Sequence, residues 1–212
     1  MTEFEWVNEM TAEKKGRDAK KMLKIVLIIL GVIVLLAGML VLYVLRIRDE
    51  SKDRIFMDEN LTVTSTAFED GGMMPVEYTG RGKDISPDLC LSALSPDAKT
   101  VAVVMDDLDH PIGTYNHWVI WNLPAQQLIP QAIPHGERLD ELGGAVQGVA
   151  YGKHCYRGPL PPKGMGTHSY KFNVYVLDTS LTLDARSTKK QLLAAMEGHI
   201  LQYGSVTGRF KS

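Results

Sequence analysis

Several motifs of common enzyme and nucleic-acid-binding classes are absent from this chain of 212 residues. It has no H-E-x-x-H zinc-protease motif, no G-x-S-x-G serine-hydrolase motif and no P-loop. It also has no C-x-x-C pair, which argues against a structural zinc site. Residues 49–212 hold 15 Lys and Arg against 20 Asp and Glu, a net charge of −5. The lack of a basic stripe argues against a nucleic-acid partner.

Cysteine is also scarce, with only Cys90 and Cys155 in the whole chain. In an oxidising exterior compartment two cysteines can form a disulfide, provided that their Cα atoms lie close enough together. The sequence does not fix that distance. A disulfide and two free thiols are therefore both open.

Charge is absent from one long segment near the N-terminus. Ile25–Leu45 comprises 21 residues without a charged side chain, and a helix of this length spans roughly 30 Å, the thickness of the hydrocarbon core of a membrane. A cleaved signal peptide has a shorter apolar region and a small-x-small cleavage site, whereas this segment ends in Tyr43-Val-Leu-Arg46. We therefore predict an uncleaved, single-pass membrane anchor.

The charges beside this segment predict its orientation. Six Lys and Arg residues lie between Lys14 and Lys24, and four follow the segment, mixed with acidic residues, up to Arg54. By the positive-inside rule, the N-terminus is expected in the cytoplasm and the remainder outside the cell. We thus expect a cytoplasmic basic segment (1–24), a transmembrane helix (25–45), a charged tether (46–60) and an extracellular domain (61–212).

Short β-type segments separated by Gly, Pro and Asp dominate the chain from Leu61 onward. The nearly unbroken apolar character of Thr100–Met105 predicts a strand covered on both faces. The other expected strands are His117–Leu123 and Tyr170–Val176, with Leu61–Phe68 and Met74–Tyr78 as outer strands.

One amphipathic helix is predicted late in the chain. Thr188 and Gln191 have the spacing of a capping box, and Gly204 is a suitable stop. The apolar stripe consists of Leu192, Leu193, Met196, Ile200 and Leu201. Many strands followed by a late helix predict a β-sandwich or a β-rich α+β domain.

Two segments are dense in ionisable and turn-forming residues. Residues 105–118 connect two predicted strands, and residues 156–170 form a loop rich in Pro and Gly that leads into His168 and Tyr170. A protonated imidazole and a phenol hydroxyl both donate hydrogen bonds to anions, and a nearby carboxylate favours the charged imidazole. These side chains could therefore bind an anion, but aspartates in turns commonly cap strands, and a histidine or tyrosine here could equally be a packed core residue.

These two segments resemble the signature regions of the phosphatidylethanolamine-binding protein family. Asp107-Leu-Asp-His-Pro111 stands where the family has D-P-D-x-P, and residues 158–170 (GPLPPKGMGTHSY) match the second signature. The resemblance covers about residues 61–208. Within the family, this part of the chain is similar to the bacterial, Raf-kinase-inhibitor-like branch. Leu108, Tyr115 and Ser169 depart from the usual pattern.

The resemblance implies a β-sandwich with a pocket for phosphate-like or carboxylate-like groups, and no cofactor. The ligand would be a small anion or a phospholipid headgroup, and a partner protein is a further expectation. The residues expected around the pocket are Asp107, Pro111, His117, Leu160, His168 and Tyr170.

A metal-assisted hydrolase is the alternative interpretation, because carboxylates and imidazoles can bind a metal ion that activates water. Its candidate ligands are Asp106, Asp107, Asp109, His110, His117 and His168.

Overall fold

The computed structural model describes residues 3–50 and 59–212, with side chains described for residues 20–45 and 59–212. The chain divides into two compact units, Met1–Arg46 and Ile47–Ser212.

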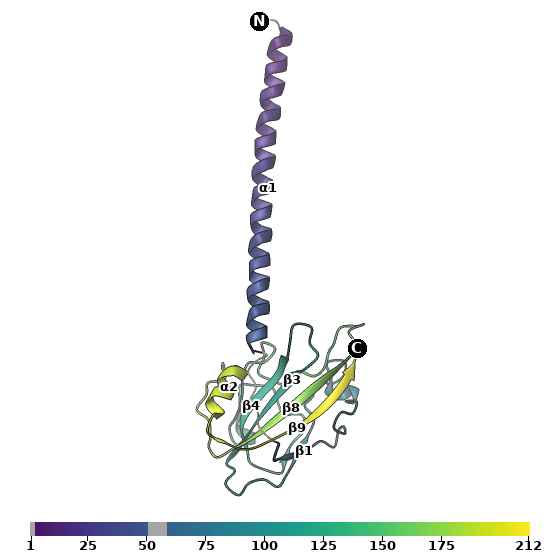
Figure 1. Cartoon of the computed structure of the whole chain (residues 1–212), viewed down its shortest axis with the longest axis vertical. Helices are drawn as coiled ribbons and strands as arrows, with labels where there is room; N and C mark the ends of the chain where they lie inside the picture. Colours follow the sequence, from purple (N-terminus) through teal and green to yellow (C-terminus); the bar gives the residue numbers. More distant parts are fainter. Residues whose placement is uncertain (1–2, 51–58) are drawn as a thin grey trace. The chain divides into compact units, whose positions relative to one another are not determined.

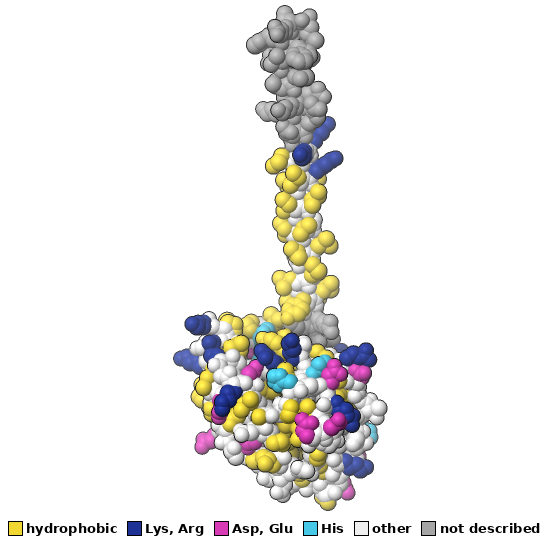
Figure 2. Space-filling model, turned by 180° about the vertical axis from the view of Figure 1, so that it is seen from behind, with side chains coloured by type: hydrophobic (Ala, Val, Ile, Leu, Met, Phe, Trp, Pro, Cys, Tyr) yellow, Lys and Arg dark blue, Asp and Glu magenta, His cyan; other side chains and the backbone are white. Residues whose placement is uncertain are grey.

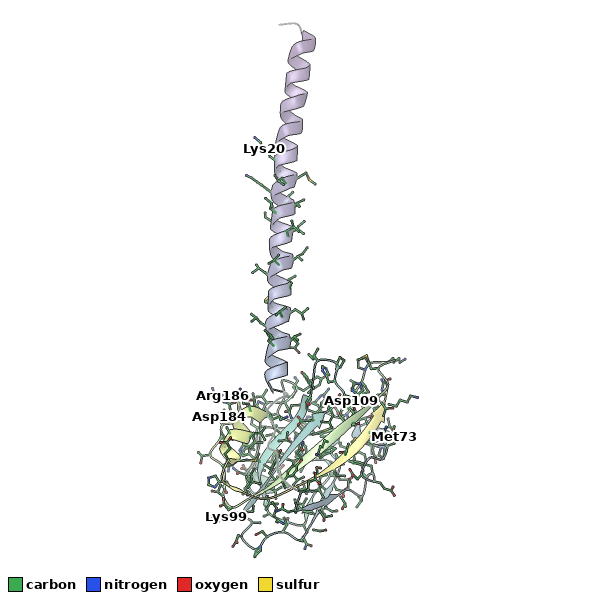
Figure 3. All side chains as sticks on the ribbon, in the orientation of Figure 1. Lys20, Met73, Lys99, Asp109, Asp184 and Arg186 are labelled. Carbon is green, nitrogen blue, oxygen red and sulfur yellow. The ribbon has the colours of Figure 1, made fainter. Side chains whose placement is uncertain are left out.

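Helix α1 (Glu3–Glu50) makes up most of the first unit, contains the predicted span 25–45 and continues beyond it on both sides. Within α1, Lys20–Leu45 is a stretch of 26 residues with a mean hydropathy of 3.4, and none of it is buried. Hydrophobic side chains project from both visible sides of this stretch (Figure 2, Figure 3). It is long and apolar enough to cross a membrane. Residues 51–58 of the predicted tether lie outside the described residues.

The second unit contains two antiparallel sheets (Figure 1). The smaller has the order β1-β2-β5, with bounds Thr62–Thr64, Leu89–Ser92 and Leu128–Ile129. The larger has the order β6-β7-β4-β3-β8-β9, with bounds Arg138–Leu139, Ala145–Gln147, Tyr115–Pro124, Thr100–Asp107, Thr167–Leu177 and Ile200–Lys211. Two short 3-10 helices, Val76–Tyr78 and Asp140–Leu142, and helix α2 (Lys189–Met196) complete the domain.

Each face of the larger sheet packs on its own hydrophobic core. Val101, Val103 and Met105 on one face of β3 share a core with residues of the smaller sheet, such as Leu89 and Leu91. The opposite face, which includes Ala102 and Val104, packs with the α2 residues Leu192, Leu193 and Met196. All eight residues of β3 are buried, so the prediction of a strand covered on both faces is confirmed. The domain is a β-sandwich with a helix on its outer face.

Two predicted outer strands are shorter than expected or absent. Leu61–Phe68 contributes only Thr62–Thr64 to a strand. Met74–Tyr78 forms a 3-10 turn after Pro75 instead of a strand. Proline fixes its own φ and lacks an N–H group, which favours a turn over a paired strand at this position.

The end of the predicted helix is wrong, although its start is confirmed. The Thr188 amide donates to Gln191 Oε1 at 2.9 Å in the capping box. The helix stops at Met196, however, and Ile200, Leu201 and Gly204 belong to β9, which pairs with β8 along its length. At Gly204 a Cβ atom would collide with the Leu61 carbonyl oxygen. Glycine is required there by the close approach of another backbone, so it does not mark a helix stop.

Candidate ligand-binding site

The site begins at the end of β3, where two adjacent aspartates face opposite sides of the sheet because side chains alternate along a strand. Figure 3 shows Asp109 just beyond this end and Lys99 at the other end of the strand. Asp107 lies on the face of the smaller sheet, and Asp106 lies on the face of α2. There the Lys189 Nζ atom is 2.8 Å from Asp106 Oδ2. The alternation therefore separates two buried carboxylates that are neighbours in sequence.

A bulge in β4 turns His117 toward the same side as Asp107. Met105 pairs with Trp118 and Asp106 with Asn116, so His117 is the extra residue between them. A bulge of this kind breaks the alternation of side chains and re-aims one of them. The His117 ring consequently lies 5.3 Å from that of Tyr170 across the sheet, at an interplanar angle of 80°.

His168 and Tyr170 reach the site from β8, on the face that also carries Phe172 into the core. The His168 Nδ1 atom is 2.8 Å from Asp107 Oδ2, and both side chains are almost completely buried. The second oxygen of Asp107 accepts a hydrogen bond from the Asp109 amide at 2.9 Å. These contacts fix both the carboxylate and the imidazole before any ligand binds.

The Pro- and Gly-rich loop that closes the site is attached to the domain through Asp84. The Gly158 amide donates to Asp84 Oδ1 at 2.6 Å, and the Arg157 guanidinium lies 2.8 Å from Asp84 Oδ2. The Arg157 carbonyl oxygen is 2.8 Å from His117 Nδ1. A Cβ atom at Gly158 would lie only 2.8 Å from the Thr79 Cα atom, so the loop can pack there only as glycine.

The six residues predicted for the site line one pocket of about 160 Å³. The structure adds five residues to them: His110, Tyr151, Pro161, Pro162 and Met165. The sequence suggests His110 only as a candidate metal ligand, although its place between Asp109 and Pro111 is a usable signal for the pocket. Tyr151 lies in a turn with φ of 53°. At the site its ring contacts those of His117 and Tyr115 edge-on, and the ring centroids are 5.2 Å apart in both pairs. No sequence pattern indicates those contacts.

Burial sets the protonation of several pocket groups. It lowers the pKa of His117 below its ordinary value, against the opposing effects of the Arg157 carbonyl and the carboxylates of Asp107 and Asp106. Burial also lowers the pKa of His110, against the effect of Asp107. The pKa of Tyr170 is raised far above its ordinary value, first by burial and then by Asp107, so its hydroxyl stays protonated.

The candidate metal ligands do not all converge on this pocket. Asp106 lies on the other face of the sheet with Lys189, and Asp109 Oδ2 accepts a hydrogen bond from the Ser169 amide at 2.7 Å. Among the residues with described side chains, no group of three His, Cys, Asp or Glu is arranged to hold a metal ion. The geometry thus favours the anion site over the metal-assisted hydrolase.

The structure also shows the state of the two cysteines and the role of Leu108, which departs from the family pattern. Cys90 and Cys155 are both free thiols. At Leu108, where the resemblance leads one to expect proline, the backbone amide donates to the Ser169 carbonyl oxygen at 2.9 Å. Proline has no N–H group to make this bond, so the departure ties the turn to β8.

Known proteins support the assignment that the fold and the pocket suggest. The family model described as phosphatidylethanolamine-binding protein matches residues 64–211. A UPF0098 protein of Pyrococcus abyssi is 39% identical over 154 residues, which cover 72% of this chain and 86% of the relative. The crystal structure of a phosphatidylethanolamine-binding protein homologue from Chlamydia trachomatis superposes with a TM-score of 0.63 at 30% identity, covering 73% of this chain and 99% of that one.

One relative bears on location in the cell. A Mycobacterium tuberculosis protein that carries the name lipoprotein LppC is 31% identical over 153 residues, which cover 72% of this chain and 73% of the relative. Its name and the apolar stretch Lys20–Leu45 together indicate membrane association. The signature segments, the sandwich fold and the family match agree, and the chain belongs to the phosphatidylethanolamine-binding protein family.

Proposed function

We propose that this chain is a membrane-anchored binding protein whose pocket takes a phosphate-like or carboxylate-like anion. The observation that carries the proposal is the paired use of His117 and His168. Each uses its Nδ1 atom within the protein, toward Arg157 O and Asp107 Oδ2 respectively. This leaves Nε2 of each ring for a ligand in the pocket that both residues line.

The pocket offers hydrogen-bond donors to an anion. A protonated imidazole donates through Nε2, and the Tyr170 hydroxyl is held in its donor form. Hydrogen bonds in which the acceptor is charged contribute about 1.5–3 kcal/mol each. A volume of about 160 Å³ accommodates a phosphate or carboxylate group but leaves little room for more.

Exposed apolar side chains around the mouth favour an anion that carries an apolar group. Tyr151, Leu160 and Met165 line the pocket and are 51%, 48% and 44% exposed. In the domain residues 59–212, the other exposed large hydrophobic residues are Met73, Val76, Leu108 and Leu128. A phospholipid would place its headgroup in the pocket and its first methylenes on this rim, each buried methylene contributing about 0.8 kcal/mol. A partner protein could also bind to this exposed apolar rim.

The proposal is tested by titrating the full chain in detergent micelles with inorganic phosphate and with a short-chain phosphatidylethanolamine. The chain has six histidines, all within the domain, so ¹⁵N-histidine labelling gives six reporters. We expect the ring signals of His110, His117 and His168 to shift at millimolar phosphate. We expect the short-chain lipid to bind at least about tenfold more tightly, because two or more methylenes reach the rim.

The remaining histidines are internal controls. His135, His154 and His199 do not line the pocket, and their signals are expected to stay in place. Unchanged signals from all three pocket histidines with both ligands would exclude the anion site. Equal affinity for phosphate and lipid would retain the site and exclude the lipid as its preferred source of anion.

We also propose that Ile25–Leu45 spans the membrane, with 1–24 in the cytoplasm, 46–60 as the tether and 61–212 outside. The support is the charge difference, six Lys and Arg before the span against four after it. In intact cells, an external protease is then expected to digest the domain. Neutralising the six basic residues between Lys14 and Lys24 should reduce the digested fraction. Full protection of the wild-type domain until the cells are opened would contradict this orientation.

A further inference from the structure

His110 is a third imidazole in the pocket, and its contacts differ from those of the other two. Its ring stacks on that of Tyr115, with centroids 4.7 Å apart and an interplanar angle of 26°. Its Nδ1 atom is buried and has no hydrogen-bond partner among the described residues. The corresponding atoms of His117 and His168 are both engaged. A buried polar atom without a partner destabilises the protein, so the hydrogen-bonding capacity of this ring is not fully used.

The titratable groups around His110 come from its own loop, from β3, β4 and β8, and from the turn that holds Tyr151, whereas the Pro- and Gly-rich loop lines the pocket with side chains that are not ionisable. The loop of His110 supplies Asp109, and the last residue of β3 supplies Asp107. Asp107 is already paired with His168. Tyr115 and His117 come from β4, and Tyr170 joins His168 from β8. The further titratable group at the mouth is Tyr151, whose ring lies 5.2 Å from that of Tyr115. Three imidazoles thus surround a small volume in which only Asp107 among the lining residues carries a negative charge.

We propose that this pocket takes up protons together with its anion, and that His110 is a ligand-recognition residue that receives one of them. The inference rests on the proposed anion site and adds to it a residue, a charge and a dependence on pH. A buffer acid in the solvent releases the proton, which binds to the imidazole, and the new N–H group donates a hydrogen bond to the bound anion. The favoured ligands are therefore anions with at least two acceptor oxygens, one facing His110 and one facing the His117–His168 side.

The direction of the pH effect follows from the two protonation equilibria. Burial holds the pKa of His110 and His117 below the ordinary value of 6.5, so both rings are neutral at pH 7 in the ligand-free protein. An anion within hydrogen-bonding distance raises a histidine pKa by about 1–3. Between the bound-state pKa and the lower free-state pKa, each proton taken up increases anion affinity about tenfold for each pH unit of decrease. The gain ends once the pH falls below the free-state pKa.

The experiment is calorimetry of sulfate binding to the full chain in detergent micelles, in buffers with different ionisation enthalpies. Sulfate keeps its charge over the range used, about pH 6 to pH 8, so the protons measured belong to the protein. We expect the wild type to take up more than one proton per sulfate. His110→Gln keeps a polar side chain that cannot be protonated, and should lower the uptake by roughly one proton and the affinity at pH 6 by about tenfold. His199→Gln, at a histidine outside the pocket, should change neither value.

A second measurement does not depend on a variant. In the wild type, the pKa of His110 is measured by NMR with and without saturating sulfate, and we expect a rise of about 1 or more. Sulfate binding with no proton uptake, or with uptake that His110→Gln leaves unchanged, would overturn the inference and leave the anion site standing. Failure of the wild type to bind either sulfate or phosphate would overturn both.

Discussion

Replacing Lys189 by methionine is expected to destabilise the domain by about 3–5 kcal/mol, the usual cost of leaving one member of a buried ion pair unpaired. The Lys189 ammonium lies 2.8 Å from Asp106 Oδ2, and both side chains are less than a tenth exposed. Without it, the side-chain partner left among the described residues is Asn116, whose amide donates to Asp106 Oδ1 at 3.1 Å. An amide cannot neutralise a buried carboxylate. Urea denaturation followed by tryptophan fluorescence gives the free energy of unfolding.

Two further variants separate this explanation from a general effect of the substitution. Lys99→Met makes the same change at an exposed lysine just before β3, and is expected to alter stability by no more than about 0.5 kcal/mol. The double variant Asp106→Leu with Lys189→Met removes both charges, and should recover most of the loss. An equal cost for Lys189→Met and Lys99→Met, or no recovery in the double variant, would refute the buried-pair explanation.

The ion pair also matters for the pocket, because Asp106 and Asp107 are neighbours on opposite faces of β3. With Lys189 present, Asp106 has a cation on its own side of the sheet. Without Lys189, its charge would act through the sheet on His117 and oppose an incoming anion. We therefore expect Lys189→Met to weaken anion binding as well as stability, although Lys189 does not line the pocket.

The sequence predicts the parts of the fold that depend on local pattern. Thr100–Met105 is apolar throughout because β3 is covered by the smaller sheet on one face and by α2 on the other. Thr188 and Gln191 start the helix through contacts between near neighbours. The error at Gly204 has a different origin. Its role depends on the backbone of Leu61, which is remote in sequence, and no pattern within β9 records that approach.

The same distinction applies to the site. Asp107 and His168 lie in recognisable signature segments, and both line the pocket. The bulge that directs His117 depends on the register between β3 and β4, which the sequence does not specify. Tyr151 reaches the pocket through a turn from outside both signatures. Asp106 was grouped with the metal ligands by proximity in sequence, although strand alternation places it on the other face.

Replacing His168 by glutamine should weaken anion binding by about 100-fold or more, the largest effect that we expect on the pocket. The change removes the imidazole N–H that donates a hydrogen bond to the anion, and a hydrogen bond to a charged acceptor contributes about 1.5–3 kcal/mol. An imidazole beside Asp107 can carry a compensating positive charge, whereas glutamine cannot, so the negative charge of this buried carboxylate faces the ligand uncompensated. At about 6 Å and an effective dielectric constant of about 20, this repulsion adds roughly 2–3 kcal/mol. Both effects have the same sign. The affinity is measured from the His117 ring signal during titration with phosphate.

A second aspartate–histidine pair in the chain supplies the matched control. The His199 Nδ1 atom lies 2.9 Å from Asp178 Oδ1, almost the same geometry, but about half of each side chain is exposed. His199→Gln should leave phosphate affinity unchanged. Adding Asp107→Asn to His168→Gln removes the unpaired charge, and should recover roughly tenfold of the loss or more if repulsion contributes as argued. No recovery would assign the whole effect to the lost donor, whereas unchanged binding in His168→Gln itself would exclude His168 from ligand recognition.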